Sequence, residues 1–240
     1  MRIYSLKNVF LQRKSEGGYS LHIKDFFLNS GEHIAITGRS GSGKSTVLDI
    51  LALTLEPNSV DQFLLMNNKE TFDVKELWKL RDVDKFSRIR NETIGFVLQS
   101  GGLFPFLSAE ENLRLPIELK RKLTSEDRDW LSFLVETLNI ECILGNHPSS
   151  LSIGERQRVA IARAMSLRPE VVFADEPTAA LDPKLANQVM QLFMKAAQEF
   201  GSAIVMVSHD LALVKKFGFT NIPIQIGTNG QSAVLERSSP

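Results

Sequence analysis

A run of glycine, serine and one lysine near the N-terminus has the residue types to hold a phosphorylated ligand. It reads G-x-x-x-x-G-K-S, the pattern of a phosphate-binding loop, and lies between an apolar run over 34–36 and a helix-like run from Thr46 to Leu55. A simple turn containing these residues is the alternative, but the strand before it and the helix after it favour the phosphate loop. We predict that the phosphates contact Gly38, Arg39, Ser40, Gly41, Ser42, Gly43, Lys44, Ser45 and Thr46.

The residue types of this loop suit a nucleotide. Glycines let the backbone fold tightly, so that successive N–H groups point at the phosphates. The start of the following helix adds the positive end of its dipole. Lys44 brings a positive charge to the β- and γ-phosphates, and Ser45 offers a hydroxyl to Mg²⁺. The predicted ligand is therefore a nucleotide with Mg²⁺.

Polar residues follow two other predicted buried strands. Asp175 and Glu176 follow the apolar run 171–174, and His209 follows the apolar run 203–207. In a parallel sheet, ligands gather at the carboxyl ends of the strands, and the phosphate loop leaves such an end. We predict that Asp175 is a Mg²⁺-associated carboxylate and that Glu176 orients or deprotonates an attacking water. His209 is expected to hydrogen-bond the γ-phosphate or this water.

Other interpretations of these residues exist. Asp175 and Glu176 precede a proline, and a plain turn would look the same in isolation; a histidine is more often structural than catalytic. The presence of a phosphate loop and the positions of these residues at strand ends favour the catalytic roles. His22, His33 and His147 have no such placement, and we predict structural roles for them.

Gln99 follows another predicted strand, Thr93 to Leu98, and is placed at the same sheet edge. Its amide can contact Mg²⁺ or the water and report the state of the nucleotide to the helical segment that follows. A solvated glutamine in a turn is the alternative. We include Gln99 among the predicted catalytic and metal-contacting residues.

The segment 151–155 offers a serine hydroxyl, a glycine and a helix N-terminus, which together form a second anion-binding surface. One chain has little use for two phosphate-binding surfaces on one nucleotide, whereas two chains arranged head-to-tail could each lend this surface to the other's nucleotide. An ordinary N-cap is the alternative. We predict nucleotide contacts for Ser152, Gly154 and Glu155.

Composition limits the possible partners and compartments. The 240 residues are 43% hydrophobic, enough for a real core and one domain, and 28 basic residues balance 28 acidic ones. The net charge of zero gives no general argument for nucleic acid. The single cysteine, Cys142, excludes an internal disulfide and is predicted to fill the core within the apolar stretch Leu138 to Leu144.

No signal-peptide core and no run of about 18 apolar residues is present, so any membrane span is expected on another chain.

Residues 67–92 differ from the rest of the chain in composition, since 13 of the 26 are charged with both signs mixed. We predict that they form a solvated, mostly helical excursion. The periodicity elsewhere predicts strands over 3–10, 19–28 (after a turn at 17–18), 60–66, 93–98, 171–174 and 203–207, edge strands over 222–226 and 233–235, and helices over 46–55 (ended by Pro57), from 108 (with a kink at Pro116), 124–138, 156–167 and 183–200.

The motifs, in this order, resemble the nucleotide-binding subunit of ATP-binding cassette (ABC) transporters across nearly the whole chain. The matching elements are a Walker A (Gly38–Ser45), a Q-loop glutamine (Gln99), an LSGGQ-type signature (Leu151–Glu155), a Walker B (Val171–Asp175) with Glu176, a D-loop (Ala180–Asp182) and a switch histidine (His209). The stretches 90–99, 111–116 and 155–164 are most similar to the lipoprotein-release and macrolide-efflux branch, with the cell-division ABC ATPase a near neighbour.

The resemblance implies an α/β fold, a P-loop NTPase of the ABC type. Its core would be a RecA-like mixed or parallel sheet, joined by an N-terminal antiparallel β subdomain and a helical subdomain. A single domain would span 1–240, with the core and β subdomain over 1–102 and 168–240 and the helical signature subdomain over about 103–167. The loop after Gln99, with Phe104 and Phe106, would belong to the surface that couples to a membrane subunit.

The resemblance also implies an activity and partners. The activity is hydrolysis of ATP to ADP and phosphate with Mg²⁺, whose contacts would be Ser45, Gln99 and Asp175. A homodimer would form in the ATP-bound state with two ATP molecules between phosphate loop and signature. A separate membrane permease would be the partner, with no nucleic acid, and the chain would lie on the cytoplasmic face of the inner membrane.

Some residues depart from the family pattern. The signature has Ile153 and Glu155 where the common form has Gly and Gln. No residue is assigned to stack on adenine: Phe10 is too early, Arg13 lies near the expected position, and Tyr19 is an alternative. Three other functions remain open, namely a cell-division or mechanotransmission ATPase, a soluble ABC protein acting on ribosomes or DNA, and a regulatory module that binds ATP without hydrolysis. Retention of both Glu176 and His209 argues against the last.

Overall fold

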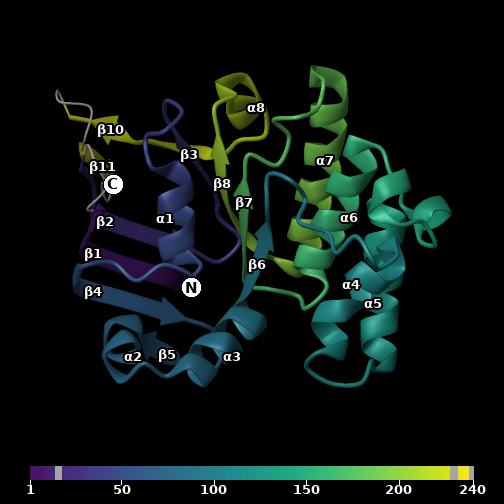
Figure 1. Ribbon diagram of the computed structural model, residues 1–240, viewed down its shortest axis with the longest axis horizontal. Coiled ribbons are helices and arrows are strands. Elements are labelled where there is room, and N and C mark those ends of the chain that lie inside the picture. Colours follow the sequence, from purple (N-terminus) through teal and green to yellow (C-terminus); the bar gives the residue numbers. More distant parts are fainter. Residues whose placement is uncertain (14–17, 228–231, 238–240) are drawn as a thin grey trace.

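The computed structural model describes residues 1–13, 18–227 and 232–237 (Figure 1). It contains two sheets and a group of helices at one end. The strands are β1 (Arg2–Arg13), β2 (Tyr19–Asn29), β3 (His33–Thr37), β4 (Ser59–Met66), β5 (Thr71–Asp73), β6 (Ile94–Val97), β7 (Val171–Asp175), β8 (Ala203–Ser208), β9 (Thr220–Pro223), β10 (Gln225–Ile226) and β11 (Ser232–Glu236). The helices are α1 (Lys44–Leu51), α2 (Val74–Leu80), α3 (Val83–Thr93), α4 (Ala109–Glu118), α5 (Ser125–Thr137), α6 (Ile153–Met165), α7 (Pro183–Phe200) and α8 (Leu211–Lys216).

The first sheet has the order β10-β11-β2-β1-β4-β5 and is antiparallel except where β11 runs parallel to β2. Its two long strands, β1 and β2, pair along most of their length, from Arg2 opposite Asn29 to Arg13 opposite Tyr19. Apolar side chains such as Leu6, Leu21 and others on these strands are fully buried. The predicted antiparallel β subdomain is therefore present.

The second sheet is parallel, with the order β6-β7-β8-β3-β9. Successive side chains of a strand point to opposite faces of the sheet, and both faces of the central strands are covered. On β7, Val171 and Phe173 face the core that contains α1 and the antiparallel sheet, whereas Val172 and Ala174 face the core that contains α7. The carboxyl ends of β3, β6, β7 and β8 consequently meet at one edge.

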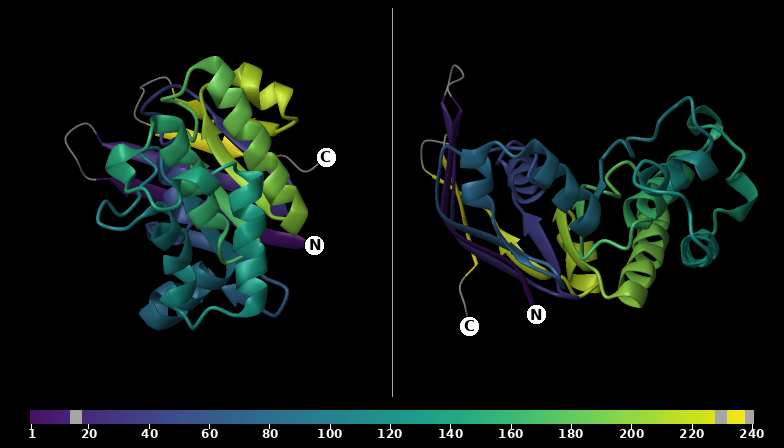
Figure 2. Two further views of the ribbon diagram at one scale, coloured as in Figure 1. Left: turned by 90° about the vertical axis from the view of Figure 1, so that its right-hand side faces the viewer. Right: turned by 90° about the horizontal axis from the view of Figure 1, so that it is seen from below.

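Helix α1 lies between the two sheets, and helices α4, α5 and α6 form a separate group that we call the helical lobe (Figures 1 and 2). All three helices of this lobe begin with a capping box, in which a serine or threonine and an acidic residue three positions later bond each other's backbone N–H. The excursion 67–92 holds α2 and α3, as predicted, together with the short strand β5.

Four sequence predictions about local structure are corrected. Cys142 is exposed, so it does not fill the core; the short 3₁₀ helix Glu141–Ile143 turns this segment outward. Helix α1 ends at Leu51, before Pro57, because Leu53 takes a positive φ of 60°. Helix α6 starts at Ile153 rather than near 156. Strand β11 is not an edge strand, since it pairs with both β10 and β2. Of the turn predicted at 17–18, residue 17 lies outside the described residues.

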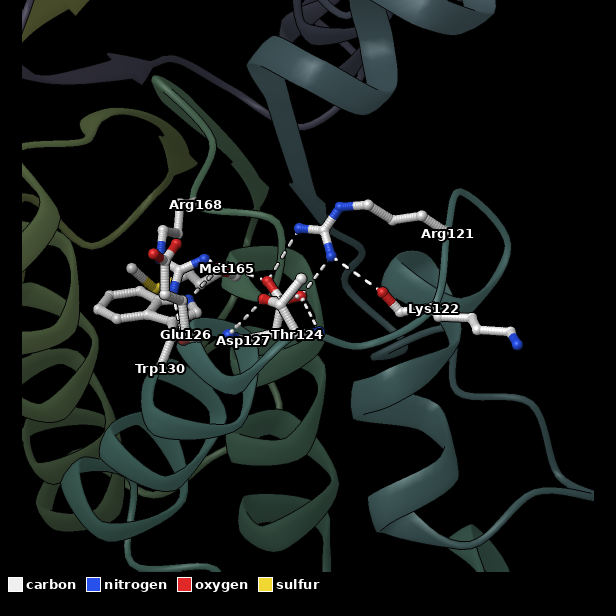
Figure 3. Close-up of polar contacts among 8 residues, drawn as sticks. All are labelled: Arg121, Lys122, Thr124, Glu126, Asp127, Trp130, Met165 and Arg168. Atoms are coloured by element: carbon white, nitrogen blue, oxygen red, sulfur yellow. Dashed lines mark hydrogen bonds and ion pairs between the residues drawn. The ribbon is translucent and has the colours of Figure 1, made fainter.

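A buried carboxylate is the centre of a hydrogen-bonding network in the helical lobe (Figure 3). Asp127 of α5, whose side chain is only 2% exposed, accepts hydrogen bonds from Arg121, Arg168 and both the N–H and the hydroxyl of Thr124. Arg168 follows α6 and also donates to the carbonyl of Glu126. The hydrogen bonds from Arg121 lower the pKa of Asp127 well below its ordinary range, against the effect of burial. The network joins the loop after α4, the start of α5 and the end of α6.

We expect Asp127→Asn to lower the free energy of unfolding by about 2–3 kcal/mol at pH 7, because hydrogen bonds to a charged group are lost while the arginines remain. Chemical denaturation measures this. Asp129→Asn is the matched control, because Asp129 lies exposed on the same helix; its effect should stay within about 0.5 kcal/mol.

The pH dependence follows from the lowered pKa of Asp127. A carboxyl whose pKa is lowered by folding adds stability above its ordinary pKa of about 3.9 and loses it as the pH falls toward the folded-state value. The difference in stability between wild type and Asp127→Asn should therefore narrow below about pH 4. A difference that stays constant down to pH 3 would contradict this assignment.

Candidate functional site

The predicted phosphate loop joins the end of β3 to the start of α1. Gly41 and Gly43 have φ values of 75° and 92°, in the region that favours glycine, and this curls the loop around the N-terminus of α1. Lys44, the first residue of α1, is buried; its Nζ donates to the carbonyls of Gly38 at 3.1 Å and Arg39 at 2.9 Å. Lys44 therefore lies folded back along its own loop.

Asp175 lies at the end of β7 and contacts the phosphate loop directly. The Ser45 hydroxyl donates to its Oδ1 at 3.1 Å, although the two residues are 130 positions apart. Partial burial raises the pKa of Asp175; the hydrogen bond from Ser45 and the charge of Lys44 oppose this, while the charge of Glu176 adds to it. The structure thus brings together the hydroxyl and the carboxylate for which we predicted contacts to Mg²⁺.

Glu176 and His209 lie at the ends of neighbouring parallel strands. Nδ1 of His209 is 3.3 Å from Oε2 of Glu176, and the N–H of Glu176 donates to the carbonyl of Val207 on β8. Glu176 has a φ of 44°, unusual for a residue with a side chain. The bond to β8 holds this backbone beside the strand that leads to His209, and the carboxylate contacts that histidine.

These residues border one cleft with a volume of about 530 Å³. Gln99, in the loop after β6, lines the same cleft, at the sheet edge where it was predicted. The lining residues are Arg13, Tyr19, Ser40, Gly41, Gly43, Lys44, Ser45, Thr46, Gln99, Asp175 and Glu176. His209 is exposed and does not line this cleft, but it contacts Glu176, which does. Three segments distant in sequence therefore supply a phosphate loop, two carboxylates and an amide to a single space.

Ser152, Gly154 and Glu155 do not line this cleft among the residues that the structure describes. Ser152 caps α6: its hydroxyl accepts from the backbone N–H of Glu155 at 3.3 Å, and its own backbone N–H donates to Oε2 of Glu155 at 2.8 Å. Gly154 is buried, and a Cβ there would lie 2.7 Å from Cδ2 of Leu185 on α7. The glycine thus permits close packing of α6 on α7, while Ser152 remains exposed on the helical lobe.

Two residues that sequence reasoning left unassigned lie in the cleft. Arg13 and Tyr19, paired across β1 and β2, both line it. Phe10 instead packs edge-on against His22, with ring centroids 6.3 Å apart. The ring of His33 packs at a tilt against Phe219, with centroids 5.7 Å apart, and burial lowers the pKa of His33, which fits the predicted structural role. No local pattern marks Tyr19, because strand pairing alone carries it to the phosphate loop.

The known proteins that are similar to this chain are ATP-binding proteins of ABC transporters. The sequence profile of ABC transporters matches residues 21–179. The chain is 40% identical over 194 residues to the lipoprotein-releasing system ATP-binding protein LolD of Idiomarina loihiensis, which covers 80% of each protein. It is 38% identical over 220 residues to the ABC transporter ATP-binding protein MJ0796 of Methanocaldococcus jannaschii, which covers 90% of this chain and 83% of that protein.

Solved structures show the same fold. A dimeric post-hydrolysis state of the ATP-binding cassette MJ0796 bound to ADP and Pi superposes with a TM-score of 0.76 at 33% identity, and covers 98% of this chain and 97% of that one. A second dimeric structure of MJ0796 superposes with a TM-score of 0.78 at 34% identity and the same coverage. The predicted α/β architecture, with its parallel core sheet and its antiparallel N-terminal sheet, is confirmed.

Proposed function

Because this chain belongs to the ABC transporter family, we propose that its cleft binds and hydrolyses ATP by means of the residues described above, within a head-to-tail dimer. The chain is a transporter-coupled ATPase subunit, and its homologues include ATP-hydrolysing cassettes. The observation that carries the assignment of residues is the single cleft that joins the phosphate loop to Asp175, Glu176 and Gln99.

We assign the reaction to groups at this sheet edge. Backbone N–H groups of the phosphate loop and the charge of Lys44 bind the β- and γ-phosphates. Glu176 accepts a proton from, or orients, the water that attacks the γ-phosphate. Its contact with His209 at 3.3 Å holds the carboxylate in place. We assign to His209 a hydrogen bond to the γ-phosphate or to this water. Gln99, which lines the same cleft, contacts Mg²⁺ or the same water.

The donor atoms at the edge of the cleft fit Mg²⁺. Ser45 and Asp175 are already hydrogen-bonded, and Gln99 lines the same cleft, so hydroxyl, carboxylate and amide oxygens are available together. Oxygen ligands of this kind are those that Mg²⁺ prefers. We propose that these three residues hold the ion with the nucleotide, where it would neutralise charge on the phosphates.

The second nucleotide surface is proposed to act between two chains. Ser152 is exposed on the helical lobe and lies outside its own chain's cleft, so a bound nucleotide could meet it only from a partner. We propose that Ser152, the backbone of Gly154 and Glu155 contact the ATP of the partner subunit. Closure would then require ATP to bind the closed state better than the open one.

Coupling to a membrane is proposed to run through the helical lobe and the loop that joins Gln99 to it. None of the helices in the described part of the chain has the length and hydrophobicity needed to cross a bilayer. Phe104 and Phe106, in the loop after Gln99, are 41% and 72% exposed, and their ring centroids lie 5.8 Å apart. An exposed aromatic pair of this kind suits a protein interface. We propose that it contacts a separate permease at the cytoplasmic face of the inner membrane.

The similarity to LolD proteins favours a permease of the lipoprotein-release or efflux type. The test is affinity capture of tagged protein from gently solubilised native membranes, followed by mass spectrometry of the bound chains. We expect a multi-span membrane protein with a large domain on the far side of the membrane, and we expect Phe106→Ser to reduce its recovery. Recovery of ribosomal or DNA-bound proteins with no multi-span chain would contradict the proposal.

A further inference from the structure

The two tyrosines of this chain donate hydrogen bonds to backbone carbonyls at the two ends of α1. The hydroxyl of Tyr19, on β2, donates to the carbonyl of Ser42 at 2.9 Å, one residue before the N-cap Gly43. The hydroxyl of Tyr4, on β1, donates to the carbonyl of Leu51 at 2.9 Å, at the last residue of the helix. The antiparallel sheet is thereby bonded to α1 at both ends, and one of these bonds lies inside the phosphate loop.

The hydrogen bond from Tyr19 sets the orientation of the peptide group between Ser42 and Gly43. The carbonyl of Ser42 and the N–H of Gly43 belong to one planar trans peptide, so they point in opposite directions. When Tyr19 holds the carbonyl toward the sheet, the N–H of Gly43 must point to the other side. That N–H is one of the loop donors expected to meet the phosphates.

Without such a bond, this peptide is easily turned. Gly43 has a φ of 92° and no side chain, so rotation of the peptide before it meets little steric resistance. Tyr19 lies directly against Gly43, because a Cβ on this residue would come 1.5 Å from the tyrosine hydroxyl oxygen. Partial burial raises the pKa of Tyr19, which keeps the hydroxyl protonated and able to donate.

We propose that Tyr19 is a positioning residue for phosphate binding: its hydroxyl holds the Ser42–Gly43 peptide so that the N–H of Gly43 is directed at the nucleotide's phosphates. This inference rests on the phosphate-loop role proposed above. It gives Tyr19 a function different from stacking on a base, since the group that acts is the hydroxyl and the ligand group affected is the phosphate chain.

The test is the affinity of Tyr19→Phe for ATP and for inorganic tripolyphosphate, measured by titration calorimetry with Mg²⁺. The variant keeps the ring and removes only the hydroxyl. We expect Kd to rise about two- to tenfold for both ligands, the range for loss of one hydrogen bond. The KM for ATP should rise similarly, while kcat at saturating ATP should stay close to that of the wild type.

Tyr4→Phe is the matched control, because it removes a tyrosine-to-carbonyl bond of equal length at the far end of the same helix. It should lower the unfolding temperature and leave both dissociation constants unchanged. If the two variants weaken binding equally, general destabilisation explains the result, and the positioning role is overturned.

Two other results would also overturn the proposal. Wild-type affinity of Tyr19→Phe for both ligands would show that the hydroxyl does not act on the loop. A loss of affinity for ATP with no loss for tripolyphosphate would show that Tyr19 acts on the nucleoside. Failure of the wild-type protein to bind either ligand would instead refute the phosphate-loop role on which this inference rests.

Discussion

Replacement of Glu176 by glutamine is expected to lower ATP turnover by about 10²- to 10⁴-fold, the contribution typical of a general base. The amide keeps the shape of the side chain and a hydrogen-bonding oxygen near His209, whose Nδ1 lies 3.3 Å from the wild-type carboxylate. It cannot accept the proton of the attacking water. ATP should remain bound, and the variant should therefore elute as a dimer from a sizing column with ATP.

The matched control is Glu170→Gln, which makes the same chemical change just before the opposite end of β7. Glu170 accepts a hydrogen bond from the backbone N–H of Asn68 at 3.0 Å and does not line the cleft. Its turnover should stay near that of the wild type. A Glu176→Gln protein that hydrolyses ATP at the wild-type rate would remove this residue from its assigned role. One that binds ATP but stays monomeric, even with the membrane partner present, would contradict the head-to-tail dimer.

Replacement of Lys44 by alanine is expected to raise the Kd for ATP by about 10- to 100-fold. The ammonium contributes hydrogen bonds from a charged group, each typically worth about 1.5–3 kcal/mol. Its present partners are the carbonyls of Gly38 and Arg39, at 3.1 Å and 2.9 Å, so the substitution also loosens the curl of the loop. Titration calorimetry measures the affinity.

Lys195→Ala is the control for this second variant, because Lys195 lies exposed on α7. Its affinity for ATP should not change. Thermal unfolding without nucleotide establishes that the Lys44→Ala protein is folded before its affinity is interpreted. Wild-type affinity in a folded Lys44→Ala protein would show that the phosphates are bound elsewhere.

The sequence alone predicted the features that depend on neighbours in the chain. The phosphate loop from Gly38 to Ser45 is recognisable because its spacing sets the local backbone, and the structure places it between β3 and α1. Apolar runs such as 171–174 predicted strands buried on both faces, since a strand of a parallel sheet covered on both sides buries every side chain. The same reasoning placed Asp175 and His209 at strand ends, and the common edge of the parallel sheet confirms that placement.

The tertiary structure alone decided which of these residues touch. Ser45 bonds Asp175 across 130 positions, and Tyr19 reaches Ser42 from another sheet. Such contacts depend on strand order and helix packing, which local periodicity does not encode. The exposure of Cys142 was mispredicted for the same reason, because an apolar stretch does not say which of its side chains meets the core.

Gly154 shows most clearly the difference between what the local sequence predicts and what the tertiary structure decides. As part of a motif it was predicted to contact a nucleotide, and no neighbouring residue indicated a second use. In the fold it also lets α6 approach Leu185 of α7, because a Cβ at this position would lie 2.7 Å from that side chain. Local spacing therefore determined the chemistry available to this chain. Long-range packing determined that the phosphate loop, Asp175 and Glu176 share one cleft while Ser152 faces outward, since only the folded chain brings distant segments into contact.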